Sequence, residues 1–317
     1  MPSAPTSLAG RGFFVSFRIY MIRCTFAVDM KESQYIMFPE FWDELTEKDW
    51  ADMLRLRQRL IDNPPKGVTA VDVRREAARQ LLLNRGLRTR SSDRKYLILV
   101  EQAARRLDWL WEATDQEGTL QLTWRSTNQL LPKFGNLIGP MSHGQDLLFG
   151  EFKDALTLLT AYEKSHAAAD TLLAQLCGLL WRPRDKKVKT RLQRTPYDAD
   201  GADERQQRGI RLPEWFRWGA YAWFAFFCEY LATGIFIIDG QEVTFAPVFR
   251  QTDAATDDGS PAGSSLGLNA IALTLASDRV FGSYADVHRT PLMQVMLKLL
   301  HDHQELQRLK AQYNGKP

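Results

Sequence analysis

The sequence predicts a mainly α-helical protein, a multi-helix bundle with two or three short peripheral strands. In most segments the apolar residues recur every three or four positions, the period of a helix with one buried face. Capping residues, glycines and prolines separate these segments, and strand-like alternation is confined to a few short stretches. The chain has no internal repeat with a period of about 20 to 50 residues, so a solenoid or propeller is not expected.

The composition is that of a globular protein. The 317 residues include 44% hydrophobic and 25% charged side chains, with a net charge of +3. This balance excludes collagen-like, low-complexity and wholly disordered chains, and it is too weakly basic to imply nucleic-acid binding by itself. Three widely spaced cysteines (Cys24, Cys177 and Cys228) favour a reducing compartment over a disulfide framework.

Residues 1–37 are expected to form an N-terminal tail and strand. Residues 1–12 are rich in Ser, Pro, Ala and Gly, which indicates a disordered tail. Residues 13–24 are aromatic and β-branched with polar interruptions at Arg18 and Arg23, which favours a strand. A secretion signal would instead place its basic residues before the apolar run. Residues 1–20 are alternatively an extension beyond the true start of the protein.

Residues 38–135 predict the first helical region. Thr46 is a suitable N-cap for a helix that ends at the proline turn of residues 63–67. A second helix is expected at about Thr69–Asn84, with Gly86 at its C-terminal end.

A third helix follows in the same region, capped by Ser92 or Asp93 and ending near Trp111. Residues 119–124 alternate as a short strand that could pair with the N-terminal one.

Residues 136–250 predict a central helical region around a buried apolar helix. Helices are expected at about Phe149–Ser165 and Ala167–Trp181, and the polar residues 182–211 separate them from a long apolar helix at about Pro213–Phe236. Glu242–Phe249 is expected to be extended.

The last part of the chain predicts a linker and a C-terminal helical segment. Residues 251–266 are acidic and then rich in Gly and Ser, which is typical of a flexible linker. Within residues 267–317 we expect a short helix at Leu268–Ser277. A final amphipathic helix is expected from Pro291 to about Gln312.

No motif predicts catalysis or a metal site. His301 and His303 lie two residues apart, so on a helix they point to different faces. Cys177 and Cys228 lie in apolar helices, where a buried thiol is expected. We therefore expect no metal, no cofactor and no enzymatic activity, although catalytic residues that meet only in space leave no local pattern.

Residues 182–194 form a basic loop with seven basic residues and one acidic residue. It could neutralise phosphates, which gives nucleic-acid binding as an alternative function, but it lacks the interleaved aromatic residues that stack on single strands. A solvated, partly mobile loop is the preferred interpretation, and the run is as consistent with binding of an acidic protein partner as with binding of nucleic acid. Tryptophan and arginine often anchor protein interfaces. The predicted partner-binding residues are Trp42, Trp181, Arg182, Arg184, Lys186, Lys187, Lys189 and Arg191.

The apolar run of residues 215–238 is long enough to span a bilayer, so membrane association is a further alternative. Glu229 lies deep in this run, where insertion of a charge costs about 2.5–3.5 kcal/mol. A central helix surrounded by other helices is therefore the preferred interpretation.

Several short motifs occur in an order that resembles a family. They are Phe38–Thr46, similar to a Pro-x-x-Trp-x-Glu-Leu-Thr element; Leu131–Lys133 and Gly139-Pro140; Phe149–Phe152, a Phe-Gly-Glu-Phe helix start; Leu179–Pro183, a Leu-Tyr-Arg-Pro helix end with Trp for Tyr; Ala246–Phe249; Val280–Ser283; and Pro291–Met293. Over about residues 38–310 the chain thus resembles tail-assembly chaperone-like proteins of tailed phages and prophages from Bacteroidetes-type bacteria.

The resemblance implies a non-enzymatic tail-assembly protein, either a chaperone or a minor tail component. Its partners would be other tail proteins, such as the long tape-measure protein or the tube subunit. It would act in the cytoplasm of the bacterial host, and the particle itself is a second location. The family supplies no catalytic residues to carry over, and its oligomeric state does not follow from the resemblance.

Overall fold

The computed structural model of the protein describes residues 36–87, 94–113, 120–165, 168–187, 193–249 and 264–314. These residues are mainly α-helical, as the sequence predicts. Their strands are more numerous than the two or three expected, but all are short and pair in three small antiparallel sheets. The predicted N-terminal strand and the acidic part of the predicted linker lie outside the described residues.

The first helices begin where the sequence indicates, because each has a threonine cap. The Thr46 hydroxyl accepts the Asp49 backbone N–H at 3.2 Å, and the Asp49 carboxylate accepts the Thr46 N–H at 2.9 Å. Thr69 and Asp72 form the same reciprocal capping box. The elements of this region are the turn η1 (Trp42–Glu44), α1 (Glu47–Arg57), the π-helical turn η2 (Gln58–Asp62), α2 (Ala70–Asn84) and α3 (Arg94–Ala104).

The third helix ends earlier than predicted. It stops at Ala104, and the chain continues through η3 (Asp108–Leu110) into the strand β1 (Trp111–Ala113). This strand pairs with β2 (Leu120–Leu122), so the predicted strand at 119–124 is confirmed with a local partner. The Leu110 carbonyl accepts the Thr123 N–H at 3.0 Å. This hydrogen bond joins Leu110 to the segment after β2, and the local sequence pattern does not reveal it.

The sequence analysis missed the helix that follows the basic loop in the central region. The helix α6 (Ala202–Ile210) packs against α5 (Ala169–Leu180) through closely apposed backbones. A Cβ atom on Gly178 would lie only 1.8 Å from the Arg205 carbonyl oxygen, and one on Gly209 equally close to that of Ala174. Because glycines and not an apolar stripe make this contact, the periodicity gave no signal. The neighbouring elements are β3 (Lys133–Phe134), β4 (Leu137–Ile138), η4 (Ser142–Gly144), α4 (Phe149–Lys164) and β5 (Arg182–Pro183).

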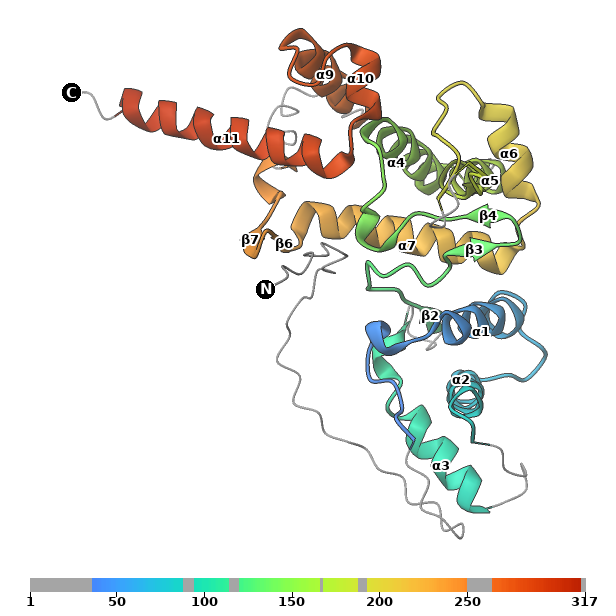
Figure 1. The fold of residues 1–317 in the computed structure, drawn as a ribbon. Helices are drawn as coiled ribbons and strands as arrows, with labels where there is room; N and C mark the ends of the chain where they lie inside the picture. Colours follow the sequence, from blue (N-terminus) through green and yellow to red (C-terminus); the bar gives the residue numbers. More distant parts are fainter. Residues whose placement is uncertain are drawn as a thin grey trace, which may run out of the picture.

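The apolar helix α7 (Glu214–Thr233) is central, as predicted. It packs on α1, α4 and α5, and Figure 1 shows it running between the layer of α1–α3 and the layer of α4–α6. Phe216, Trp223 and Phe227 are fully buried in it. None of the described helices is long and apolar enough to cross a membrane.

The helix α7 ends before Phe236, which corrects its predicted C-terminus. Residues beyond Thr233 form the hairpin of β6 (Phe236–Ile238) and β7 (Gln241–Val243). The turn residues Asp239 and Gly240 both have positive φ angles, 51° and 80°, as a tight hairpin requires. Residues 246–249, expected to be extended, are helical.

The C-terminal part consists of three helices, of which the middle one was not predicted. They are α9 (Ser264–Ser277), α10 (Tyr284–Arg289) and α11 (Leu292–Asn314). Because α9 begins at Ser264, the last residues of the predicted linker 251–266 are helical. In Figure 1 the helix α11 leads away from the rest of the chain. One continuous apolar cluster from Ile36 to Met296 joins all these regions into a single core.

Candidate functional site

Two of the predicted partner-binding residues are part of the core. Trp181 is fully buried, and its indole N–H donates to the Leu131 carbonyl at 2.8 Å. Arg182 is 6% exposed and pairs with the buried Glu151. Neither side chain is accessible to a partner, so both are withdrawn from the predicted interface. The sequence analysis located the end of this helix correctly, but the side chain of Arg182 is held inward because it pairs with the buried Glu151.

That acid, Glu151, is the centre of a buried ion cluster. Its carboxylate is fully buried and pairs with Arg182 at 2.9 Å and with Arg194. The guanidinium groups also donate to backbone carbonyls, from Arg182 to Thr195 at 2.9 Å and from Arg194 to Leu180 at 2.9 Å. Burial lowers the pKa of Arg182, and the charge of Glu151 opposes this effect. The cluster is saturated by internal partners, which identifies it as a structural element.

The two ends of the basic loop are therefore anchored and not free to bind phosphate. Between them, Arg184, Lys186 and Lys187 are exposed, whereas Lys189 and Arg191 lie outside the described residues. Trp42 is half-buried, packs edge-on against Trp109 at 5.1 Å and donates to the Thr123 carbonyl. Of the predicted residues that the structure describes, Trp42, Arg184, Lys186 and Lys187 retain exposed surface, but they do not form one site.

A pocket lies at the C-terminal end of α7, and the sequence analysis did not identify it. Its floor is the turn η4 with the following Gln145, where His143 has a φ of 60° and Gly144 a φ of 64°. A Cβ atom on Gly144 would lie 2.5 Å from the ring of Phe227, so only glycine fits this close approach. The His143 N–H donates to the Thr127 carbonyl at 2.8 Å, and its Nδ1 lies 2.6 Å from the Thr127 hydroxyl. These bonds hold His143 in a conformation that non-glycine residues rarely adopt.

The ion cluster positions this floor. Asp146 accepts the Met141 backbone N–H at 2.7 Å with one carboxylate oxygen. Its other oxygen accepts the Arg194 Nε–H at 3.0 Å. The basic residue at the end of the predicted loop thus stabilises the turn that carries His143.

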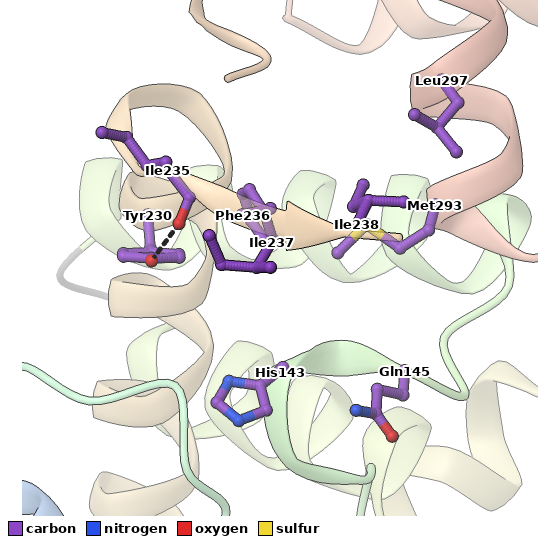
Figure 2. A pocket seen from close by; sticks show the side chains of 9 residues that line it. All are labelled: His143, Gln145, Tyr230, Ile235, Phe236, Ile237, Ile238, Met293 and Leu297. Atoms are coloured by element: carbon purple, nitrogen blue, oxygen red, sulfur yellow. Dashed lines mark hydrogen bonds between the residues drawn. The ribbon is translucent and has the colours of Figure 1, made fainter. Parts of the chain in front are cut away.

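The walls of the pocket are apolar, and its cavity volume is about 310 Å³. Figure 2 shows β6 and the end of α7 on one side and α11 on another, above His143 and Gln145. The Tyr230 hydroxyl donates to the Ile235 carbonyl at 2.6 Å, which fixes the chain where it leaves α7. Two rim residues are well exposed, Ile235 at 52% and Leu297 at 36%. The wall residues are Tyr230, Ile235, Phe236, Ile237, Ile238, Met293 and Leu297.

The lining of the pocket is mainly apolar, with His143 and Gln145 as the polar groups of its floor. Burial lowers the pKa of His143, with only partial opposition from the charge of Asp43, so its imidazole is neutral at pH 7. Among the described residues, neither an acidic side chain nor a cysteine lines the cavity. In the part of the chain that the structure describes, no group of three or more His, Cys, Asp or Glu side chains is placed to hold a metal ion. Apolar walls over two polar groups fit an apolar side chain or a short apolar segment.

The sequence contains little that could have revealed this pocket. Its residues come from η4, α7, β6 and α11, which are far apart along the chain. The Asp239-Gly240 pair does indicate a hairpin, and recognising it would have moved Phe236 and its neighbours out of the predicted helix. Comparisons with protein-family models, curated proteins and solved structures find no match for this chain.

Proposed function

We propose that this chain is a non-enzymatic phage or prophage tail-assembly protein that binds an apolar segment of another tail protein in the pocket between α7, β6 and α11. A chaperone role fits this proposal best, with a minor tail component as the related alternative. The partner would be the tape-measure protein or the tube subunit, and binding would take place in the cytoplasm of the bacterial host.

The pocket is the observation that carries the proposal. It is open at a rim of exposed apolar residues, Ile235 and Leu297, and most of its described lining is apolar. A segment of a partner that is not yet assembled must be kept out of water, and an open apolar pocket provides that shelter. A cavity of about 310 Å³ has room for one or two large apolar side chains of such a segment.

The family landmarks give a second line of support. Glu151, from the Phe-Gly-Glu-Phe motif, pairs at 2.9 Å with Arg182, from the Leu-Trp-Arg-Pro motif. These two motifs are distant in the sequence but pair in one buried cluster, as expected of motifs that proteins of one fold share. The same cluster reduces the case for nucleic acid, because it removes Arg182 and Arg194 from the charge that the loop presents.

A tagged pull-down from cells that produce the phage tests the proposal. The variant Ile235→Asp places a charge on the pocket rim, and Ile210→Asp on the remote helix α6 is its matched control, because the two isoleucines are 52% and 53% exposed. The wild type and the control are expected to recover a tape-measure or tube protein, and the rim variant is expected to lose it. Equal recovery of that protein by all three, or recovery of nucleic acid alone, would contradict the proposal.

A further inference from the structure

The helix α11 carries an apolar stripe that continues beyond the body of the protein. Residues at alternating spacings of three and four form this stripe, which is the pattern of a two-helix seam. Leu306, Leu309 and Tyr313 are 38%, 60% and 86% exposed, and all described residues from 304 to 313 are exposed. The apolar residues of the stripe are Leu292, Val295, Leu299, Leu306, Leu309 and Tyr313, and it is interrupted by Asp302, whose carboxylate pairs with Lys298 on the same helix.

The first half of the stripe is already occupied. Leu292 and Val295 are fully buried against the body of the protein, and the second half faces the same side of the helix. Residues 301–314 extend about 20 Å past this contact at about 1.5 Å per residue. A free helical segment of this length is marginal in water, so a partner on the apolar face would stabilise it.

The placement of the stripe determines which partner helix can bind. Both halves of the stripe face the same side of α11. A second copy of α11 that binds this side in parallel orientation would therefore place its own Leu292–Leu300 in the space that the body of the first copy occupies. In antiparallel orientation, each projecting half lies beside the other, and each body lies beyond the end of the partner helix.

The antiparallel arrangement is self-complementary. With the twofold axis between residues 307 and 308, Leu306 packs on Leu309 of the second copy, and the reverse pair forms by symmetry. Tyr313 then faces Asp302 of the second copy, and its hydroxyl can donate to that carboxylate. The charged flanking residues Glu305 and Lys310 face Gln312 and His303 of the second copy, so neither meets its own counterpart.

We propose that residues 301–314 of α11 form an antiparallel two-helix interface with a second copy of this chain, making a homodimer. The inference is independent of the pocket, because Met293 and Leu297 lie on the opposite side of α11 from the stripe. A seam of this length buries little area, so the dimer dissociates at micromolar concentrations.

Sedimentation velocity of the full chain, from about 1 to about 200 µM, tests the dimer. We expect a concentration-dependent shift from monomer to dimer. Leu309→Glu should raise the dissociation constant by about tenfold or more, whereas Ala311→Glu, which adds the same charge on the far side of the helix, should leave it within about twofold. A wild type that stays monomeric over this range, or an unaltered dimer in Leu309→Glu, would overturn the proposal.

Disulfide trapping tests the orientation. In the antiparallel dimer an Asp302→Cys chain mixed with a Tyr313→Cys chain should form a crosslinked heterodimer under mild oxidation, because these positions face each other. Tyr313→Cys alone should not crosslink, since its two copies lie about 16 Å apart along the axis. The wild type, with its native cysteines, serves as the background control. Efficient crosslinking of Tyr313→Cys alone would contradict the antiparallel arrangement.

Discussion

Replacing Glu151 by Gln tests the buried ion cluster, and its effect can be worked out from the structure. The Glu151 carboxylate is fully buried, and the side chains of Arg182 and Arg194 are 8% and 2% exposed. Among the described residues, the variant would leave Asp146, 30% exposed, as the acidic partner that balances two guanidinium charges in a buried site. Removing one member of a buried ion pair destabilises a protein by about 3–5 kcal/mol.

The retained bonds from the arginines to backbone carbonyls place the expected loss of unfolding free energy at the lower end, about 3 kcal/mol. At about 2 °C per kcal/mol for a chain of this size, Tm should fall by about 6 °C. Differential scanning calorimetry measures this shift. Glu112→Gln is the control, because Glu112 pairs with Arg125 on the surface, where the two side chains are 53% and 58% exposed. Its effect should be below about 1 kcal/mol.

A loss of 1 kcal/mol or less in Glu151→Gln, about the same as in the control, would refute the reasoning. It would mean that water reaches the cluster and replaces the carboxylate, so that the motif residues Glu151 and Arg182 do not hold the fold together.

Three further predictions concern a helix contact, a thiol and a histidine. Gly178→Ala should lower the unfolding free energy by about 1–3 kcal/mol in urea titrations, since its Cβ would lie 1.8 Å from the Arg205 carbonyl. Gly201→Ala, which has open space around it, should cost less than about 1 kcal/mol, because it changes only the N-cap of α6, and equal effects would contradict the close packing of α5 and α6. Burial raises the pKa of Cys177 to about 12. In a chain with Cys24 and Cys228 replaced by Ser, alkylation of Cys177 at pH 8 should therefore be negligible in the folded state and rapid in urea. Fast labelling of the folded chain would refute this burial. Because burial lowers the pKa of His143, the unfolded chain binds more protons than the folded one once the pH falls through about 6.5. The stability of the wild type should therefore decline on acidification from pH 7.5, and that of His143→Asn should decline less steeply. Identical pH profiles of Tm would contradict the account.

The sequence predicted the elements whose signals are local. Thr46 and Thr69 begin their helices as expected, because a capping box needs only residues three positions apart. The apolar spacing likewise located α4, α5, α7 and α11 to within a few residues. These features depend on neighbours along the chain, which one sequence shows directly.

The missed features depend on contacts between distant segments. The helix α6 is held by Gly178 and Gly209, which carry no apolar signal. Arg182 was assigned to a surface because nothing in residues 182–194 shows that the acid it pairs with lies at Glu151. The pocket was missed for the same reason, since His143 and Leu297 are distant in the sequence and line one cavity only in the folded chain.

Site-specific photocrosslinking in phage-producing cells tests the central claim most directly. A photoreactive phenylalanine analogue replaces Ile235 on the pocket rim or, as the control, the equally exposed Ile210 on α6. The account predicts that irradiation links the Ile235 position to a tape-measure or tube protein, with the crosslinked peptide rich in apolar residues, and that the Ile210 position gives no such product. A crosslink to that protein from Ile210 but not from Ile235, or to no tail protein from either position, would contradict the claim that this pocket binds a tail-assembly partner.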